Sequence, residues 1–552
     1  MKDLANELAA RLKGDVVTDA KTRATYSRDT SVFERTPEIV VFPKDADDVA
    51  VLVQTVAKAR SEGHTASLAP RSAGTCMTGG PLSDSVVAVF TKYMNTIEEV
   101  GDGYAIAEPG VFYRNFEKAT RKVANQLLPS FPASRELCAL GGIVGNNAGG
   151  ERTLEYGKTE DYVLELDVVL ADGTQTTFKA LSPQELAEKK TLSNLEGTIY
   201  RDLDELLTNN AAAITAAKPK VSKNSAGYAL WNIKNKERDT FDLAQLVTGS
   251  QGTLALTTKM KLRLVREQGY RSMLVVFLND LEHLPEVVRR VLPFTPESFE
   301  SYDDHTFGLA IRFLPHMLSS LGFLGALRLA FSFLPELGMV ATGGVPRLVL
   351  MAEFSEDTHE EALGKARAAE VALEDLSVRT SIKKSERRAQ KYWIVRRESF
   401  SLLRKSSKGL TAAPFIDDLV VPPESYAEFL PKLRALLDEY ADRFVYTIAG
   451  HIGNGNFHII PLMNLAKPEV RNVILELTPR VYELVLAHGG SLTGEHNDGI
   501  IRTPYLPMQF GDKIVQLFAE TKRIFDPQNI LNPGKKVGGT FADIERDMVR
   551  HG

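Results

Sequence analysis

The stretch PASRELCALGGIVGNNAGG, residues 132–150, decides how this chain folds. Glycine, alanine and asparagine dominate its second half, and such a composition is poor material for a packed helix or strand. It favours instead a backbone that lies closely along a large flat ligand, where amides and carbonyls make the contacts. Residues 132–162 are therefore expected to form ligand-binding loops without a packed helix or strand.

Three other turns rich in small residues accompany this stretch. RSAGTCMTGGPL at 71–82 follows a short strand, EPG at 108–110 precedes a helix, and VTGSQGTLALTT at 247–258 leads into a strand. Small side chains allow N–H groups of the first loop to converge, and such a nest binds phosphate oxygens. The loop is not a Walker loop and does not match GxGxxG. Taken alone, it fits either a phosphate site or an ordinary glycine-rich turn.

In their order and spacing, these motifs resemble the FAD-binding domain of the vanillyl-alcohol oxidase flavoprotein family. The resemblance implies that the first loop holds the FAD pyrophosphate, through Arg71, Ser72, Ala73, Gly74, Thr75, Gly79 and Gly80. The residues implied to approach the flavin and its ribityl chain, or to close the site, are Pro109, Gly142, Gly145, Asn147, Gly149, Gly252 and Thr253. Members with covalent flavin carry a histidine at the place of Thr75, so non-covalent FAD is expected.

A second motif, GHIGNGNFH at residues 450–458, predicts a tight hairpin. With Asn454 and Gly455 at the two turn positions, His451 faces His458 across the strand pair. Opposed residues have Cβ atoms about 5 Å apart, so two imidazoles could share one divalent metal ion. The alternative is a hairpin with a half-buried polar pair.

The segment SLTGEHNDG, residues 491–499, adds a carboxylate and another imidazole. In a regular strand Glu495 and His496 would point to opposite faces, so that one could bind a metal while the other reaches a neighbouring site. Two histidines and one carboxylate with open positions suit a catalytic divalent cation such as zinc. The alternative is an ordinary polar cluster near a turn.

GHIGNGNFH, TGEHNDG and DPQNILNPGK together resemble the C-terminal half of the FAD-linked D-2-hydroxyacid dehydrogenases, a group that includes D-lactate, D-2-hydroxyglutarate and glycolate dehydrogenases. The resemblance implies a divalent metal, with zinc expected and manganese or iron as alternatives, on His451, His458 and Glu495. It also implies His496 as the general base. The WxxRRES segment resembles the carboxylate-binding helix of the group, which implies Arg397 as clamp and Ser401 as helper.

The expected reaction is oxidation of a D-2-hydroxy acid to the 2-oxo acid with hydride transfer to flavin N5. Ile416 stands where several members have a lysine, so a small monocarboxylate such as D-lactate is favoured. Two alternatives remain: an FAD-binding electron-transfer subunit of a glycolate or lactate oxidase complex, and a transferase similar to alkylglycerone-phosphate synthase. The electron acceptor is left open among a quinone, an electron-transfer flavoprotein and an iron–sulfur partner.

The expected fold class is α+β. A two-lobed FAD-binding domain of the vanillyl-alcohol oxidase type is followed by an α+β cap with an antiparallel sheet, and the C-terminal segment returns to the flavin. The expected divisions are an N-terminal helical segment at 1–36, the FAD-binding domain at 37–266, the cap and substrate domain at 267–537 and a tail at 538–552.

Composition limits the possible binding partners, cofactors and location of the chain. The 552 residues carry a net charge of −5 with both signs interspersed, which gives no indication of nucleic-acid binding. The only cysteines are Cys76 and Cys138, which excludes a disulfide framework and a protein-borne iron–sulfur cluster and predicts a cytoplasmic, reducing location. The apolar segment 313–335 is expected either to pack on the cap or to contact a partner or a membrane surface peripherally.

Overall fold

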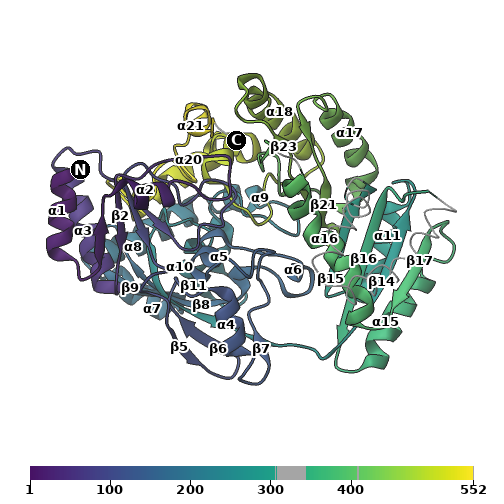
Figure 1. The fold of residues 1–552 in the computed structure, drawn as a ribbon. Helices are drawn as coiled ribbons and strands as arrows, with labels where there is room; N and C mark the ends of the chain where they lie inside the picture. Colours follow the sequence, from purple (N-terminus) through teal and green to yellow (C-terminus); the bar gives the residue numbers. More distant parts are fainter. Residues whose placement is uncertain (305, 307–343, 407–408, 551–552) are drawn as a thin grey trace.

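The computed structural model describes residues 1–304, 306, 344–406 and 409–550, and the side chains of 397–406 are outside the described part. The chain forms an N-terminal lobe from residues up to 266 and a cap from the residues that follow (Figure 1). Segment 313–335 lies outside the described residues. Within the described part of the chain, no helix has the length and apolar character needed to cross a bilayer.

The first sheet of the N-terminal lobe has four strands in the order β1-β2-β4-β3. Strands β2, β4 and β3 are parallel, and β2 and β4 are apolar and buried throughout, as parallel strands covered on both faces are. The crossover helix α3 (Ala46–Ser61) packs with α1 (Lys2–Arg11). The strands are β1 (Asp15–Val17), β2 (Ile39–Phe42), β3 (Leu68–Arg71) and β4 (Val86–Val89). Because β3 ends at Arg71, this sheet leads the chain directly into the first glycine-rich loop.

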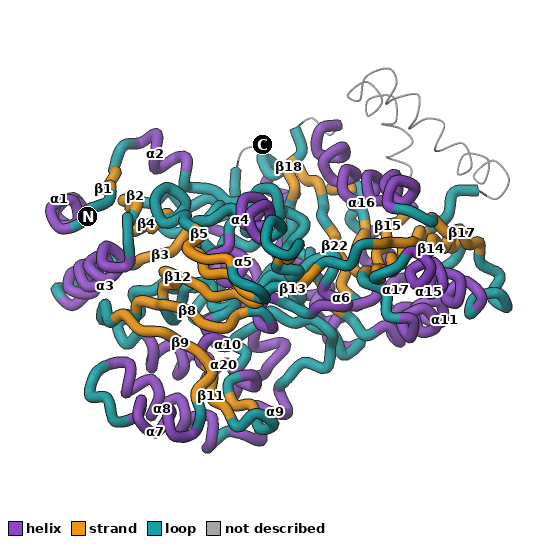
Figure 2. Tube along the Cα trace, turned by 90° about the horizontal axis from the view of Figure 1, so that it is seen from below, coloured by secondary structure: helices purple, strands orange, loops and turns teal. Residues whose placement is uncertain are grey.

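The second sheet of the lobe has seven strands in the order β10-β11-β9-β8-β12-β6-β5, with antiparallel neighbours. Buried and part-exposed residues alternate along β12, which is typical of a strand with one face on a core. Helices α7 (Pro183–Lys190) and α8 (Leu195–Asn209) lie beside β9 and β11 (Figure 2). The strands are β5 (Ile97–Val100), β6 (Tyr104–Ala107), β8 (Val163–Val169), β9 (Gln175–Leu181), β10 (Lys234–Asn235), β11 (Thr240–Asp242) and β12 (Leu256–Arg263).

The cap contains the third sheet, which is antiparallel in the order β17-β14-β16-β15-β21-β22-β19. Helices α11 (Leu284–Val291), α15 (His359–Val371) and α17 (Tyr426–Asp438) pack on one face, and α16 (Glu386–Ser406) packs on the other. The strands are β14 (Tyr270–Leu278), β15 (Ser298–Asp303), β16 (Leu348–Glu356), β17 (Arg379–Lys383), β19 (Leu419–Val420), β21 (Ile448–His451) and β22 (Asn456–Ile459). This confirms the expected antiparallel α+β cap.

The C-terminal segment returns to the N-terminal lobe, as expected. Leu531 pairs with Leu68 beside β3, and helices α20 (Leu506–Phe525) and α21 (Phe541–Asp547) lie against that lobe (Figure 1). The Asn532 side chain donates to the carbonyl oxygens of Gly80 at 2.9 Å and Gln251 at 2.7 Å. One amide therefore holds two of the glycine-rich turns together.

An ion-pair cluster joins the lobe to the cap. Glu267, in the connection between β13 (Val265–Arg266) and β14, binds Arg152 at 2.8 Å, Arg271 at 2.9 Å and also Arg121. Arg152 and Arg121 belong to the N-terminal lobe, and Arg271 begins the cap sheet. Arg152 also lies 3.5 Å from Glu297 of the cap. The loop that follows Gly150 is thus tied to the cap by charge.

The expectation of no packed helix within 132–162 was wrong. Residues Leu140–Asn146 form helix α5, in which Leu140, Ile143 and Val144 are buried. These apolar residues, spaced three and four apart, supply one packed face, and the glycines lie on the other. The amino-acid composition of the stretch concealed this spacing.

The predicted hairpin register was also wrong. His451 is paired with Asn456, and His458 is paired with Ala449. The turn is longer than two residues, because a 3-10 turn at Ile452–Asn454 and a left-handed Gly455 connect β21 to β22. The two histidines are therefore diagonal neighbours on one face of the strand pair, and their ring centroids are 5.0 Å apart.

The hairpin loop provides a stability test. Gly455 and Gly489 both have a φ of +70°, but a Cβ on Gly455 would lie 2.0 Å from the Val421 carbonyl oxygen, whereas on Gly489 the nearest atom would be 4.0 Å away. A left-handed backbone costs a non-glycine residue about 1–2 kcal/mol. Gly489→Ala should lower the free energy of unfolding by about this amount, and Gly455→Ala by clearly more. Equilibrium denaturation measures both; equal losses would contradict the close approach of Val421.

Candidate active site

The first glycine-rich loop presents free backbone donors. Among the described residues, the N–H groups of residues 72–77 donate to no acceptor in the chain. Gly74 has a φ of +73°, and a Cβ on it would meet the Arg71 guanidinium at 2.2 Å. Arg71 itself donates to the carbonyl oxygen of Arg28 at 2.7 Å and so supports the loop from behind. An array of unpaired amides of this kind fits the oxygens of a pyrophosphate.

Helix α5 presents its glycine face to open space beside this loop. A Cβ on Gly145 would meet no atom within 4 Å, and on Gly142 only Ser72 Cβ at 3.8 Å. The Pro109 carbonyl oxygen accepts from Ser72 Oγ at 2.7 Å and from the N–H of Gly141 at 2.8 Å. Three of the predicted motifs thus meet around one open surface without side chains. These residues fit a flat ring system attached to a pyrophosphate.

Asn147, Gly252 and Thr253, three more of the predicted FAD residues, make contacts inside the protein around the site. Asn147 has a left-handed backbone, and its side chain donates to Glu160 at 2.7 Å. Gly252 also has a positive φ, and a Cβ there would strike Pro70 at 2.2 Å. Thr253 is fully buried, and its hydroxyl lies 2.6 Å from that of Tyr228. Thr253 is therefore committed to the protein interior.

Gly79 and Gly80 end the first loop against the C-terminal segment. A Cβ on Gly79 would lie 2.8 Å from Ile500 Cδ1, and on Gly80 2.8 Å from Gln251 Nε2. Ala73 and Thr75 belong to the part of the loop with free amides. Gly79 has a φ of +81°, in the left-handed region that favours glycine, and Ile500 of the C-terminal segment approaches it closely.

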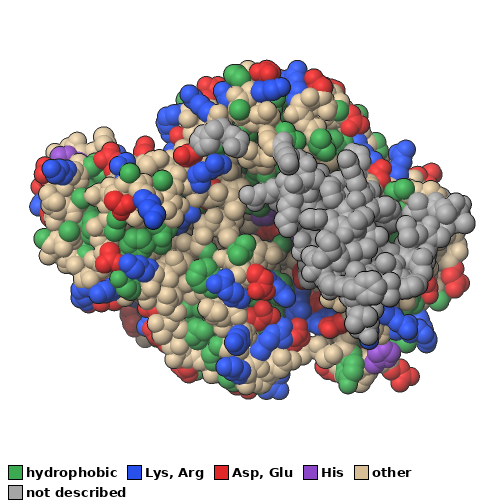
Figure 3. Space-filling view, viewed as in Figure 1, with side chains coloured by type: hydrophobic (Ala, Val, Ile, Leu, Met, Phe, Trp, Pro, Cys, Tyr) green, Lys and Arg blue, Asp and Glu red, His purple; other side chains and the backbone are tan. Residues whose placement is uncertain are grey.

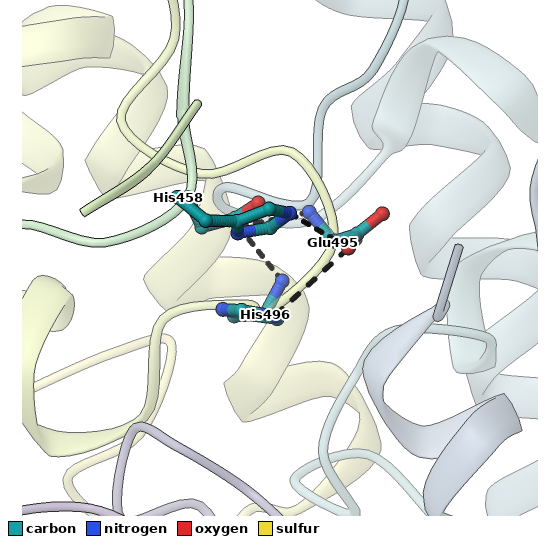
Figure 4. Close-up of side chains that lie close together, drawn as sticks. His458, Glu495 and His496 are labelled. Carbon is teal, nitrogen blue, oxygen red and sulfur yellow. Dashed lines mark hydrogen bonds and ion pairs between the residues drawn. The ribbon is translucent and has the colours of Figure 1, made fainter. Parts of the chain in front are cut away.

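Three imidazoles converge on one carboxylate oxygen. Glu495 Oε1 lies 3.3 Å from His451 Nε2, 3.4 Å from His458 Nε2 and 3.9 Å from His496 Nε2. Figure 4 shows Glu495 and the rings of His458 and His496 facing one another. All four side chains are buried or nearly so, with at most 20% of a side chain exposed. The centre is a compact polar pocket with nitrogen and oxygen donors.

Each imidazole is oriented by a carboxylate at its other nitrogen. Nδ1 of His451 lies 2.6 Å from Glu300, and the Nδ1 atoms of His458 and His496 lie 3.2 and 2.8 Å from the two oxygens of Asp417. A carboxylate at Nδ1 fixes the ring and directs the Nε2 lone pair to the centre, as in most histidine metal sites. All three rings are therefore oriented toward the same point.

The expectation that Glu495 and His496 point to opposite faces was wrong. Residues 493–498 form an irregular loop rather than a strand. Asp418 holds this loop, because its Oδ2 accepts from the N–H groups of Glu495 at 2.9 Å and His496 at 2.8 Å and from the Thr493 hydroxyl. Both side chains therefore reach the same centre.

Several residues of the centre were missed by sequence reasoning. Asp418, together with His458, Glu495 and His496, offers ligand atoms that all lie within 4.8 Å of one another. Lys223, from the N-terminal lobe, lies 2.9 Å from Glu495 Oε2. The acidic pair in the apolar run FIDDLVV could have indicated the aspartates. Neither Glu300 nor Lys223 stands in a pattern that distinguishes it from other charged residues.

Opposing electrostatic effects act on the centre. Burial by itself lowers the pKa of His458, but Asp417 and Glu495 outweigh it and raise the pKa to about 10. Burial also lowers the pKa of His496, and Asp418 and Asp417 raise it above its ordinary value. For Glu495, burial raises the pKa, but Lys223 and His451 outweigh burial and hold the pKa well below the usual range. The carboxylates around His458 and His496 thus favour the cationic form of both rings.

The histidine centre lies directly beside the glycine-rich loops. Asn497 donates to the carbonyl oxygens of Gly249 at 2.8 Å and Asn146 at 3.1 Å, and the N–H of Ile500 donates to Thr78 at 2.7 Å. A Cβ on Gly149 would lie 3.1 Å from Glu495 Oε2. Figure 3 shows the surface hollowed between the lobe and the cap, with histidine atoms visible inside. The two parts of the site therefore form one continuous centre.

The predicted carboxylate clamp falls partly outside the described structure. Arg397 and Ser401 lie on α16, and their side chains are outside the described part. The preceding Arg396 is described, and its Nε lies 2.7 Å from Glu300 Oε2. Arg396 is therefore linked through Glu300 to His451. Ile416 is fully buried in the apolar core of the cap.

Comparison with known proteins identifies two domain families. Residues 37–179 match the FAD binding domain family, and residues 267–536 match the FAD linked oxidases, C-terminal domain. The chain thus carries an FAD binding domain followed by a C-terminal domain of the FAD-linked oxidase type, and its fold is the vanillyl-alcohol oxidase type followed by an α+β cap.

Its relatives include two groups of dehydrogenases. The chain is 28% identical over 537 residues to a D-2-hydroxyglutarate dehydrogenase of Escherichia coli (strain K12), a match that covers 95% of this chain and 50% of that protein. It is 26% identical over 522 residues to a D-lactate dehydrogenase of Archaeoglobus fulgidus, covering 92% of this chain and 95% of that one. The chain spans about half the length of the D-2-hydroxyglutarate dehydrogenases that it matches first.

A solved alkyldihydroxyacetonephosphate synthase shares the fold. The TM-score is 0.65 at 14% sequence identity, and the match covers 97% of this chain and 84% of that one. Likeness at this identity shows the fold alone, and function must be argued from the site.

Asp417 allows a test of the electrostatic account. In protein freed of metal by chelation, His458 contributes stability that is fully present below its unfolded pKa of about 6.5 and is lost as pH rises through about 10. Asp417→Asn removes the charge that raises this pKa. Wild type should therefore be more stable than the variant at low pH, and this difference in unfolding free energy should decrease as pH rises from about 6.5 to about 10. Urea denaturation at a series of pH values measures the difference, and a constant difference would contradict the role of Asp417.

Proposed function

We propose that this chain is an FAD-dependent dehydrogenase that oxidises a D-2-hydroxy acid to the 2-oxo acid. The observation that carries the proposal is the convergence of His451, His458, His496 and Glu495 beside the loops of the FAD-binding domain. A non-catalytic electron-transfer subunit would not need such a centre. FAD, when bound, supplies the acceptor for the electron pair that leaves C2 of the substrate. Thr75 offers no ring nitrogen for a covalent bond, so we infer non-covalent FAD.

We assign the divalent metal to His451, His458 and Glu495, with zinc favoured over manganese or iron. Two neutral imidazoles and a carboxylate are typical ligands of catalytic zinc, and such sites keep a position open. The metal would lower the pKa of a substrate hydroxyl at that position. Glu300 and Asp417 orient the two rings for this role, through contacts of 2.6 and 3.2 Å at Nδ1.

His496 is the proposed general base. Its Nδ1 lies 2.8 Å from Asp417 Oδ2, whose negative charge stabilises the imidazolium that forms when Nε2 accepts a proton. The His496 and His458 rings are stacked, with centroids 5.1 Å apart, so the base lies next to the proposed ligands. General-base help of this kind is worth about 10²–10⁴-fold in rate.

The substrate class is a small 2-hydroxy acid, with D-lactate favoured. Because Arg396 is bound to Glu300, Arg397 is the better candidate for the carboxylate clamp, with Ser401 as its neighbour on the same helix. An arginine fork holds a carboxylate through two parallel hydrogen bonds. By the resemblance, Ile416 stands where several members have a lysine for a second acidic group, which favours a monocarboxylate. D-2-hydroxyglutarate is the second candidate, because relatives carry the name of its dehydrogenase.

Anaerobic flavin reduction tests the reaction. FAD-loaded wild type should bleach when D-lactate is added and should not bleach with L-lactate, and D-2-hydroxyglutarate in a parallel sample separates the two substrates. His496→Ala should retain FAD yet leave it oxidised for at least 10²-fold longer, because the proton acceptor is gone. The retained flavin spectrum is the internal control. Bleaching of the variant at the wild-type rate would contradict the assignment of the base.

Metal content tests the ligand set separately. His458→Ala should copurify with much less zinc per flavin than wild type, because one of three protein ligands is lost. His488→Ala is the matched control, since His488 lies at the end of helix α18 (Pro468–Ala487) and its Nδ1 lies 2.8 Å from the Leu484 carbonyl oxygen. Elemental analysis of both variants gives the ratio. Equal zinc in His458→Ala and wild type would exclude His458 as a ligand.

A further inference from the structure

The two oxygens of Glu495 have different partners. Oε1 faces the Nε2 atoms of the three imidazoles at 3.3 to 3.9 Å. Oε2 faces away from them and lies 2.9 Å from Lys223 Nζ. One oxygen of the carboxylate thus faces the proposed metal position, and the other faces the Lys223 ammonium group.

Lys223 is held firmly at this position. Its side chain is 0% exposed. The other acceptors within reach of Nζ are the Gly150 carbonyl oxygen and Asn456 Oδ1, both at 3.4 Å, so Glu495 is the nearest. A buried ammonium is costly unless it is paired, and removing one partner of a buried pair is strongly unfavourable. The Lys223–Glu495 pair is therefore a fixed feature of the centre.

We propose that Lys223 is a positioning residue that reserves Glu495 Oε2, so that Glu495 binds the metal through Oε1 alone. This inference rests on the proposed function, because it concerns the proposed metal. A carboxylate without such a partner can bind a cation through both oxygens. A second oxygen would fill the position that a catalytic site keeps open for substrate. Lys223 thereby preserves the open position.

The same contact couples the metal ligand to the flavin side of the site. Lys223 belongs to the N-terminal lobe, in the irregular segment between α9 (Ala211–Ala217) and the turn at Leu230–Asn232, whereas Glu495 lies in the loop that follows helix α18. Gly150, the backbone partner of Lys223, directly follows Gly149, on which a Cβ would lie 3.1 Å from Glu495 Oε2. The orientation of the ligand oxygen is therefore set from the lobe that holds the flavin.

Zinc K-edge X-ray absorption on the FAD- and zinc-loaded protein tests the proposal, because it counts the atoms bound to zinc without reference to activity. Lys223→Met should add one oxygen to the zinc shell and should bind zinc at least as tightly as wild type, because a competing positive charge is removed. Flavin reduction by D-lactate should slow by about 10–100-fold, the usual effect of losing an outer-shell partner. A purely structural lysine would instead weaken zinc binding and leave the shell unchanged.

Lys158→Met is the matched control. Lys158 is also buried, but its Nζ donates to the Asn224 carbonyl oxygen, the Ser225 hydroxyl and the Gly494 carbonyl oxygen rather than to the Glu495 carboxylate. This variant should keep the wild-type zinc shell. Lys223→Gln retains an N–H donor for Oε2 and should also keep the wild-type shell. Lys223→Leu, which has no donor, carries the test if Lys223→Met does not fold.

The outcomes separate the positioning role from the proposed function. An unchanged zinc shell in Lys223→Met, or an additional oxygen in Lys223→Gln or Lys158→Met, would overturn the positioning role while leaving the metal site in place. A wild-type protein that binds no zinc, manganese or iron would overturn the proposed metal centre and the role of Lys223 together. An additional oxygen in Lys223→Met alone supports the proposal.

Discussion

Buried charge must be paired, and the centre around Glu495 depends on this requirement. Moving a carboxylate out of water costs several kcal/mol even after the protein relaxes. Glu495 is buried between imidazoles from the cap hairpin, an ammonium from the N-terminal lobe and a loop held by Asp418. Each partner comes from a different part of the chain, so the centre can form only when the lobe and the cap are both folded and in contact.

The glycine-rich loops lie next to this centre and fit a bound flavin. Free amides on one loop and an open glycine face on helix α5 are suited to a flat anionic cofactor, and the family match to an FAD binding domain agrees with them. The loop of residues 491–500 touches the same turns, so the proposed metal and flavin positions adjoin. The fold by itself does not choose the chemistry, because a solved alkyldihydroxyacetonephosphate synthase shares it. The distinction lies in which side chains face the flavin.

Part of the secondary structure and the glycine-rich loops could be predicted from sequence because they depend on residues close together in the chain. The short strand expected before the first glycine-rich loop is β3, and the strand expected after the third glycine-rich turn is β12. The errors arose where local rules compete. In helix α5 the spacing of Leu140, Ile143 and Val144 outweighed a glycine-rich composition. In the hairpin, a 3-10 turn replaced the two-residue turn that Asn-Gly favours, so His451 pairs with Asn456.

Local sequence patterns could not predict which charged residues contact the histidines and Glu495. Glu300, Asp417 and Lys223 act through contacts between residues far apart in the chain, and only the folded structure brings them to His451, His496 and Glu495. Glu300 and Lys223 are of residue types common on any charged surface, so no spacing distinguishes them, whereas the acidic pair in the apolar run FIDDLVV was a local signal for Asp417.

The central claim is that the imidazoles and Glu495 hold one metal ion beside the flavin. Anomalous X-ray scattering from crystals of the purified protein, recorded above and below the absorption edge of the bound metal, tests this most directly. The account predicts a single strong peak between His451 Nε2, His458 Nε2 and Glu495 Oε1. A peak elsewhere, or no peak in crystals that contain FAD and were grown with zinc, would contradict it.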